Sequence, residues 1–283
     1  MAIPGRAFSQ INMYPSHLGQ VSIAKGIYNP ALQSTSGIVS LTSENQFYSN
    51  QLNQIRNFYL IGSVRIQKND TASLHQRFGI KFVNGIEGDY ISSPKIYGTY
   101  LWSQQLFRNL RLTAGINIGR ANYTYHATLV TGTKTAGAWD GDLGIAITGD
   151  NYKVGLSVNQ FFNSKFAPLN YSLRWKRFEV IYLERKLRLS TYADAVIFMQ
   201  STLLSSYPDR IDAGIQMILS KKFLIGVNYY LNNALIFTAG FNEIAWQNHQ
   251  VTLLFTYSTP FNKLIQIYAE TYELGIHYYL KKK

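Results

Sequence analysis

The sequence predicts an all-β protein that folds as a single transmembrane antiparallel β-barrel of about fourteen strands. Apolar and polar side chains alternate through most of the 283 residues, which is the pattern of strands whose two faces meet different environments. Charged residues make up 15% of the chain, whereas about a quarter of an average soluble domain is charged. Aromatic residues make up 14%, and membrane barrels carry rings of Tyr and Trp at both interfaces.

The clearest hairpin runs from Trp139 to Gln160. One face of its two strands is wholly apolar and is expected to contact lipid: Leu143, Ile145, Ile147, Val154, Leu156 and Val158. The other face is small or polar and is expected to line the lumen: Asp142, Gly144, Ala146, Thr148, Lys153, Gly155, Ser157 and Asn159. Between the strands, Gly149-Asp150-Asn151 tolerates positive φ and suits a tight turn.

Similar segments precede and follow this hairpin, each of about ten residues, the length that a tilted membrane strand needs. Before it, strands are expected at residues 37–47, 57–67, 77–84, 95–103 and 110–121. After it, they are expected at residues 171–183, 188–199, 211–219, 223–229, 235–241, 251–257 and 272–280. In 171–183 and 188–199 apolar residues fall on both faces, so the alternation is less regular. An even number of strands lets an antiparallel barrel close without an edge.

The N-terminal segment differs from the rest of the chain. Residues 1–35 show no sustained alternation and contain three of the seven prolines: Pro4, Pro15 and Pro30. We therefore divide the chain into an irregular segment, 1–35, and a transmembrane barrel, 36–283. The segment is expected outside the strand ladder, in the lumen or the periplasm.

Most connections on one side of the ladder are short and most on the other side are long, as in bacterial outer-membrane barrels. This arrangement predicts a wide loop, Asn122–Ala138, at the cell surface and places Asp150 in a periplasmic turn. Two further periplasmic turns are expected at Glu184–Leu187 and Asn242–Asn248.

The sequence lacks the usual signs of an enzyme. Because it contains no cysteine, it has no disulfide, thiolate metal site or thiol nucleophile. Its five histidines lack metal-ligand spacing, and no G-x-S-x-G elbow or phosphate loop occurs. We therefore expect no catalytic residue, no metal and no cofactor. The net charge of +12 comes mostly from Lys and Arg scattered along strands, so we expect contacts with anionic headgroups rather than with nucleic acid.

Charged residues on the polar faces form the candidate luminal site: Arg77, Lys81, Arg111, Asp142, Lys153, Asp212 and Glu273. Both signs are present, so ion pairs across the lumen and a selective anion pathway both fit. Glycines on the same faces either allow strand curvature and close packing or make room in the lumen for a plug or an inserted peptide: Gly79, Gly115, Gly119, Gly144, Gly155, Gly214, Gly226 and Gly275. Aromatic residues near strand ends are expected in the interfacial girdles: Tyr97, Tyr100, Trp102, Trp139, Tyr229, Tyr257 and Tyr278.

Short motifs precede the first strand, which starts near Gly37. They are Phe8-Ser9-Gln10, Met13-Tyr14-Pro15 and Tyr28-Asn29-Pro30-Ala31. In these motifs, and in its length and strand spacing, the chain resembles the PorP/SprF family of type IX secretion membrane proteins from Bacteroidetes. The family motif residues are Tyr28, Asn29, Pro30 and Ala31.

This resemblance implies a non-enzymatic protein of the outer membrane that works with the secretion and gliding machinery. The implied partners are a large secreted adhesin with a type IX C-terminal domain, other type IX secretion components and outer-membrane lipids. Two other functions fit the residues: a porin-like solute channel, and a soluble or periplasmic β-rich binding protein. The first ten residues lack an apolar signal core, which favours the binding protein.

Overall fold

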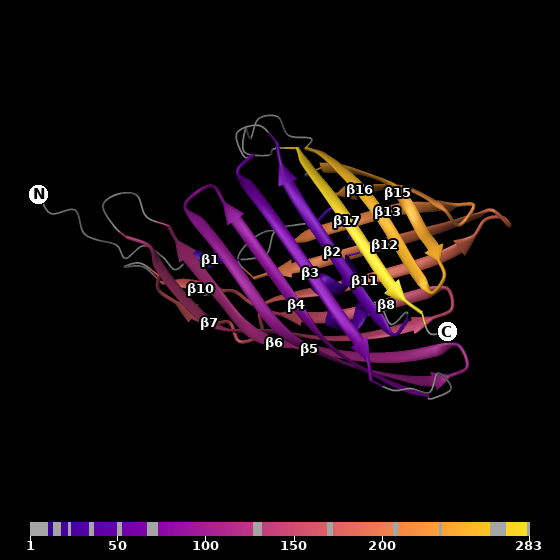
Figure 1. The fold of residues 1–283 in the computed structure, drawn as a ribbon, viewed down its shortest axis with the longest axis horizontal. Helices are drawn as coiled ribbons and strands as arrows, with labels where there is room; N and C mark the ends of the chain where they lie inside the picture. Colours follow the sequence, from indigo (N-terminus) through magenta and orange to yellow (C-terminus); the bar gives the residue numbers. More distant parts are fainter. Residues whose placement is uncertain are drawn as a thin grey trace, which may run out of the picture.

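The fold is a closed antiparallel barrel, as predicted. The computed structural model describes residues 11–13, 18–21, 24–33, 37–49, 53–66, 73–126, 132–168, 172–205, 209–231, 234–260 and 270–281. Within these residues, fourteen strands pair in chain order and β17 closes the ring on β2 (Figure 1). The barrel strands are β2 (Val39–Tyr48), β3 (Ile55–Arg65), β4 (Leu74–Glu87), β5 (Ile91–Phe107), β6 (Leu110–Tyr125), β7 (Lys134–Gly149), β8 (Tyr152–Asn159), β11 (Phe178–Arg188), β12 (Ala193–Leu204), β13 (Arg210–Leu219), β14 (Phe223–Tyr230), β15 (Ala234–Trp246), β16 (His249–Pro260) and β17 (Thr271–Leu280).

The hairpin of β7 and β8 shows how the alternation is used. Leu143, Ile145 and Leu156 point outward and keep 42%, 53% and 47% of their surface exposed. Asp142 and Ser157 on the opposite face are buried. The same exposed apolar face continues around the wall, for example at Ile80, Ile96, Ile225, Phe237, Phe255 and Leu274. Because the closed ladder pairs the main-chain groups, this face can meet lipid without leaving them unsatisfied.

Several strand boundaries differ from the prediction. Glu184–Leu187 is not a turn, because these residues lie inside β11 and the connection to β12 follows at residues 189–192. Asn242–Asn248 is mostly strand: β15 continues to Trp246 through an irregularity in register between Phe241 and Ile244. A bulge of this kind adds an unpaired residue and interrupts the apolar alternation that the sequence pattern relies on.

The loop predicted at Asn122–Ala138 is also shorter than expected. β6 extends to Tyr125 and β7 begins at Lys134, so both ends of the predicted loop are strand. Residues 127–131 of the predicted loop lie outside the described residues. The strand predicted at 171–183 is divided, because β11 starts only at Phe178.

The connection between β8 and β11 forms a small sheet at one end of the barrel. We call the end that carries this connection the loop end. The opposite end of the barrel is called the turn end. In that connection, β9 (Lys165–Phe166) pairs with β10 (Leu173–Trp175), and β1 (Ile11–Met13) adds to β10 in parallel. In Figure 1, β1 and β10 lie near the left end and the end of β17 lies at the right. A buried cluster joins the sheet to β6: it contains Ala121 and Tyr123 of β6 with Phe166, Leu173 and Trp175 of the sheet.

The chain passes from β1 at the loop end into the barrel and reaches β2, which begins at the turn end. Residues 18–21 and 24–33, here called the luminal strap, include α1 (Lys25–Tyr28) and a 3₁₀ turn, η1 (Pro30–Leu32). Strap side chains pack in two buried clusters against inward side chains of the wall: Leu18, Ala24, Ile27 and Tyr28 with Tyr59, Ile61, Phe178, Val180 and Leu204, and Val21, Ala31 and Leu32 with Ala146, Tyr182 and Phe198. The predicted domain boundary falls in residues 34–36, outside the described residues. No helix in the described ranges is long and apolar enough to cross a bilayer.

A charge introduced at the centre of the outward face tests this arrangement. We expect Ile145→Lys to destabilise the folded barrel by about 2–4 kcal/mol, because lysine at the bilayer midplane carries that cost. The measurement is urea unfolding of the purified protein in lipid vesicles, with Ile145→Leu as the control. Equal stability of the two variants would place Ile145 away from lipid.

Candidate functional site

The first part of the strap is held by its main chain. Glu273 on β17 accepts hydrogen bonds from Gly19 N at 2.7 Å and from Gln20 N at 3.1 Å. Asn228 on β14 donates to Gly19 O at 2.8 Å. Both wall residues are buried, and a carboxylate that accepts two successive amide N–H groups makes charge-assisted bonds. The wall therefore binds the peptide backbone here rather than a side chain.

The segment from Tyr28 to Ala31, predicted as the family motif, docks on the opposite wall. The Asn29 side chain caps η1, since its oxygen accepts from Ala31 N at 2.9 Å, and Pro30 starts the helical turn. The Asn29 Nδ2 group donates to Ile145 O on β7 at 3.4 Å and to Leu156 O on β8 at 3.1 Å. One buried amide thus folds the strap locally and ties it to the seam between two strands.

Glycines make this close approach possible. A Cβ added at Gly115, Gly144 or Gly155 would lie 2.7, 2.1 or 2.7 Å from the nearest strap atom. At Gly79 and Gly119 a Cβ would instead lie 2.2 and 1.8 Å from a main-chain oxygen of the adjacent strand. An added Cβ at Gly275 would likewise lie 2.4 Å from Gln20 Oε1 of the strap. Both predicted uses of the luminal glycines therefore occur: four make room for a plug, and others allow the wall strands to pack closely.

A buried charge pair fixes the centre of the strap. Lys81 donates to Ile27 O at 2.7 Å and to Asp142 Oδ2 at 2.9 Å, and both charged side chains are almost fully buried. Asp142 also accepts from Asn117 Nδ2 at 2.9 Å and from Gln160 N at 3.2 Å. Because every partner is polar and well placed, the pair avoids the large cost of an unpaired buried charge.

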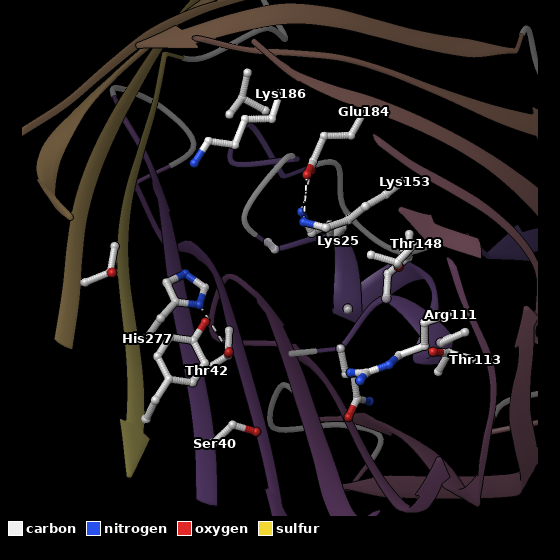
Figure 2. Close-up of a pocket in the computed structure, with 18 of the residues that line it drawn as sticks. Lys25, Ser40, Thr42, Arg111, Thr113, Thr148, Lys153, Glu184, Lys186 and His277 are labelled. Carbon is white, nitrogen blue, oxygen red and sulfur yellow. Dashed lines mark hydrogen bonds and ion pairs between the residues drawn. The ribbon is translucent and has the colours of Figure 1, made fainter. Parts of the chain in front are cut away.

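A second ionic group joins the strap to the turn end of the barrel. Glu184 on β11 binds Lys25 of the strap and lies 2.7 Å from Lys153 on β8 (Figure 2). Tyr182 donates to the same carboxylate at 2.6 Å. Burial lowers the pKa of Lys25 to about 7, and the nearby Lys153 cation acts in the same direction, while Glu184 opposes both.

These residues border a polar pocket of about 610 Å³. Its floor is formed by the strap at Lys25, Leu32 and Gln33, and its mouth by turn-end residues such as Arg108 and Asp150. Figure 2 shows the side chains that line it, labelled Lys25, Ser40, Thr42, Arg111, Thr113, Thr148, Lys153, Glu184, Lys186 and His277. The strap therefore separates this pocket from the loop end.

A histidine stands in the wall of the pocket. His277 Nε2 lies 3.0 Å from Glu44 Oε1, and its Nδ1 lies 3.1 Å from Thr42 Oγ1. His277 and Glu44 are both buried, so the imidazole and the carboxyl group face each other away from water.

The predicted luminal residues separate into two groups. Some contact the strap, directly or through one ion-pair partner: Lys81, Asp142, Lys153 and Glu273. The others lie elsewhere on the wall: Arg77 donates to Gly37 O at 2.9 Å and to Ser63, Arg111 donates to Gln105 at 3.3 Å, and Asp212 is buried in β13.

One predicted girdle residue is inside the barrel. Tyr97 is buried and donates to Asp140 at 2.7 Å, next to Lys95, so it belongs to a luminal polar cluster. The prediction that Tyr97 belongs to the girdle is wrong. It used the position of Tyr97 near the end of the expected strand, but not the face of the strand on which the side chain lies.

Sequence reasoning also missed Glu184 and Lys25. The sequence pattern predicts Glu184 in a turn, whereas in the structure it pairs with Lys153 in the register of β8 and β11. Extending the polar face of β11 by one position would have found this pair. Nothing in the local sequence pairs Lys25 with a residue 159 positions away.

The arrangement suits non-covalent holding of a polypeptide. Among the described residues, no group of three or more His, Cys, Asp or Glu side chains could hold a metal ion. The wall supplies carboxylate, amide and ammonium groups that bind main-chain atoms of the strap, together with apolar surface for its side chains.

The glycine contact can be tested with a buried reporter. Val21 is fully buried and the chain has no cysteine, so Val21→Cys should resist maleimide labelling in the folded barrel. We expect Gly144→Ala in this background to expose the thiol, because overpacking at the strap costs about 1–3 kcal/mol. Gly98→Ala is the control, since its Cβ would meet no atom closer than 3.9 Å. Equal labelling of both variants would contradict the docking of the strap.

The ionic group offers a second test. Glu184→Gln leaves two lysines without their shared carboxylate, so we expect stability to fall by about 3 kcal/mol, the lower end for a broken buried pair. Asp194→Asn removes the partner of the more exposed Lys186, and we expect a loss below about 1 kcal/mol. Urea unfolding in vesicles measures both variants. If Glu184→Gln lowers the free energy of unfolding no more than Asp194→Asn does, the ionic group of Glu184, Lys25 and Lys153 does not stabilise the fold.

The structural comparisons support the barrel fold. The toluene transporter TbuX of Ralstonia pickettii is 10% identical, with a TM-score of 0.60 over 92% of this chain and 94% of that one. The monoaromatic hydrocarbon channel CymD is 10% identical, with a TM-score of 0.58 over 92% and 93%. The Pseudomonas putida toluene transporter TodX is 12% identical, with a TM-score of 0.55 over 95% and 99%. At these identities the similarity shows the fold alone.

The sequence comparison is more specific. Among curated proteins, none matches the chain. Residues 11–278 match the family described as type IX secretion system membrane protein PorP/SprF, which confirms the predicted family. This match spans nearly all of the chain and agrees with its closed barrel and exposed apolar belt. The protein therefore belongs to the PorP/SprF family of type IX secretion system membrane proteins and resides in the bacterial outer membrane.

Proposed function

We propose that this barrel is a non-enzymatic accessory of type IX secretion and gliding that helps to export or anchor a large surface adhesin through its C-terminal secretion domain. Family membership carries this proposal. The luminal strap supports it, because a segment fixed by Glu273, Asn228, Lys81 and Asn29 occupies space that an open pore would need.

The loop end is the proposed contact surface for the partner. Long connections gather there, and the β1–β10–β9 sheet packs on β6 through a buried cluster. Phe162, in the β8–β11 connection, is 45% exposed although it is apolar. In this proposal the loop end faces the cell surface, the turn end faces the periplasm, and the luminal glycines serve the chain's own strap.

A solute channel is the second candidate function. The pocket at the turn end and the fold shared with hydrocarbon transporters favour it. Planar-bilayer recordings separate the two functions: steady open conductance by the purified protein would favour the channel, whereas a silent membrane is expected for an accessory whose lumen is occupied.

Co-purification from native membranes tests the accessory role. We expect the tagged full chain to recover a large secreted protein or a secretion component, identified by mass spectrometry. Phe162→Asp should reduce this recovery several-fold because it places a charge on the proposed contact surface. Phe107→Asp is the matched control, since Phe107 is 71% exposed at the turn end.

Two outcomes would oppose the proposal. Recovery of no secreted protein or secretion component with the unaltered chain would contradict the accessory role itself. A loss caused by Phe107→Asp but not by Phe162→Asp would move the contact surface to the turn end.

A further inference from the structure

The lipid-facing wall contains an apolar groove of about 670 Å³. It crosses neighbouring strands from β5 to β12, and its walls are outward-facing side chains of two adjacent rows: Tyr100, Trp102, Ala114, Ile116, Leu143, Ile145, Leu156, Val158, Ile181 and Leu203. We call this concavity the wall groove. It lies on the outer side of the wall against which the strap docks.

Small residues explain why the wall is hollowed here. Ala114 pairs with Trp102 on one side and with Ile145 on the other, so a methyl group stands between large outward side chains. On the inner side, Gly115 and Gly144 present no side chain, and the backbone of both also lines the groove. The wall between strap and groove is therefore little more than a layer of main chain.

Asn29 connects the two sides of this layer. Its amide donates to the carbonyl oxygens of Ile145 and Leu156 from inside the barrel. The side chains of the same two residues line the groove outside and are 53% and 47% exposed. The docked strap thus holds the strand segments that shape the groove.

We propose that the wall groove is a binding site for an acyl chain of a membrane lipid. The groove opens on the exposed apolar belt, so hydrocarbon from the bilayer is the medium that meets it. A flexible chain can follow an irregular concavity and gain dispersion contacts on several sides, which a smooth wall does not offer.

The lining opposes a polypeptide as the occupant. A peptide strand in hydrocarbon needs partners for its N–H and C=O groups, and the barrel strands already use theirs in the closed ladder. The groove lining includes one acidic side chain, Glu179, at one end, and this carboxylate lies 3.2 Å from Arg177. The Arg177 side chain is 59% exposed and can meet a lipid phosphate at that end.

Photo-crosslinking tests the site with the full chain. The barrel is placed in vesicles of phosphatidylethanolamine and phosphatidylglycerol that contain a phosphatidylethanolamine with a diazirine on one acyl chain. After illumination and digestion, we expect adducts to be several-fold more frequent on the groove strands β7 and β8 than on β14 and β15, which face lipid on the opposite part of the wall.

A matched pair of substitutions identifies the groove as the cause. Ala114→Trp fills the concavity, so adducts on β7 and β8 should fall to the level of β14 and β15. Ala239→Trp adds the same side chain at an outward, exposed alanine of β15 and should leave the adducts unchanged. Heat-modifiable migration in electrophoresis verifies that both variants are folded.

Three results would overturn the proposal. Adducts spread evenly around the unaltered wall would show no site, whatever the behaviour of the variants. Preferential labelling by a diazirine fatty acid over the phospholipid would replace the membrane lipid with a free amphiphile. Cross-linking of the groove to a protein in native membranes would make it a protein interface. None of these results depends on whether the barrel serves adhesin export.

Discussion

Closure of the strand ladder is the constraint on which the rest of the structure depends. Hydrocarbon offers no partner for a main-chain N–H or C=O, so a spanning sheet must pair its last strand with its first. β17 does so along its whole length, from Leu280 opposite Val39 to Thr271 opposite Tyr48. A closed wall encloses a lumen, and the polar groups on its inner face must then find partners inside the protein.

The strap supplies many of those partners. Glu273, Lys81 and Glu184 are inward charges on three separate strands, and each is bound to an atom of the strap. Buried charges are tolerated only when they are paired and hydrogen bonded, so strap and wall depend on each other. The strap also affects the outer surface of the wall. Asn29 binds the carbonyl oxygens of Ile145 and Leu156, whose side chains line the wall groove.

The alternation of apolar and polar residues predicted the strand faces correctly wherever one face contacts lipid and the other lines the lumen. The hairpin of β7 and β8 has the predicted faces, with Ile145 exposed and Asp142 buried. The pattern failed where a residue's surroundings came from elsewhere in the fold. Tyr97 was expected near a strand end, but β5 runs from Ile91 to Phe107, and Tyr97 lies within it and points inward to Asp140. Glu184 lies within β11, where it reaches Lys153 and Lys25.

The sequence by itself determined that the chain is an antiparallel barrel with about fourteen half-apolar strands, because the period of two is a local property of extended backbone. It also predicted a family motif at Tyr28 to Ala31. Only the tertiary structure decided that this motif docks on Gly115, Gly144 and Gly155, and which charges share an ion pair. Some of those contacts join residues more than a hundred positions apart, such as Asn29 with Ile145 and Leu156. Such residues meet only when the barrel closes around the strap.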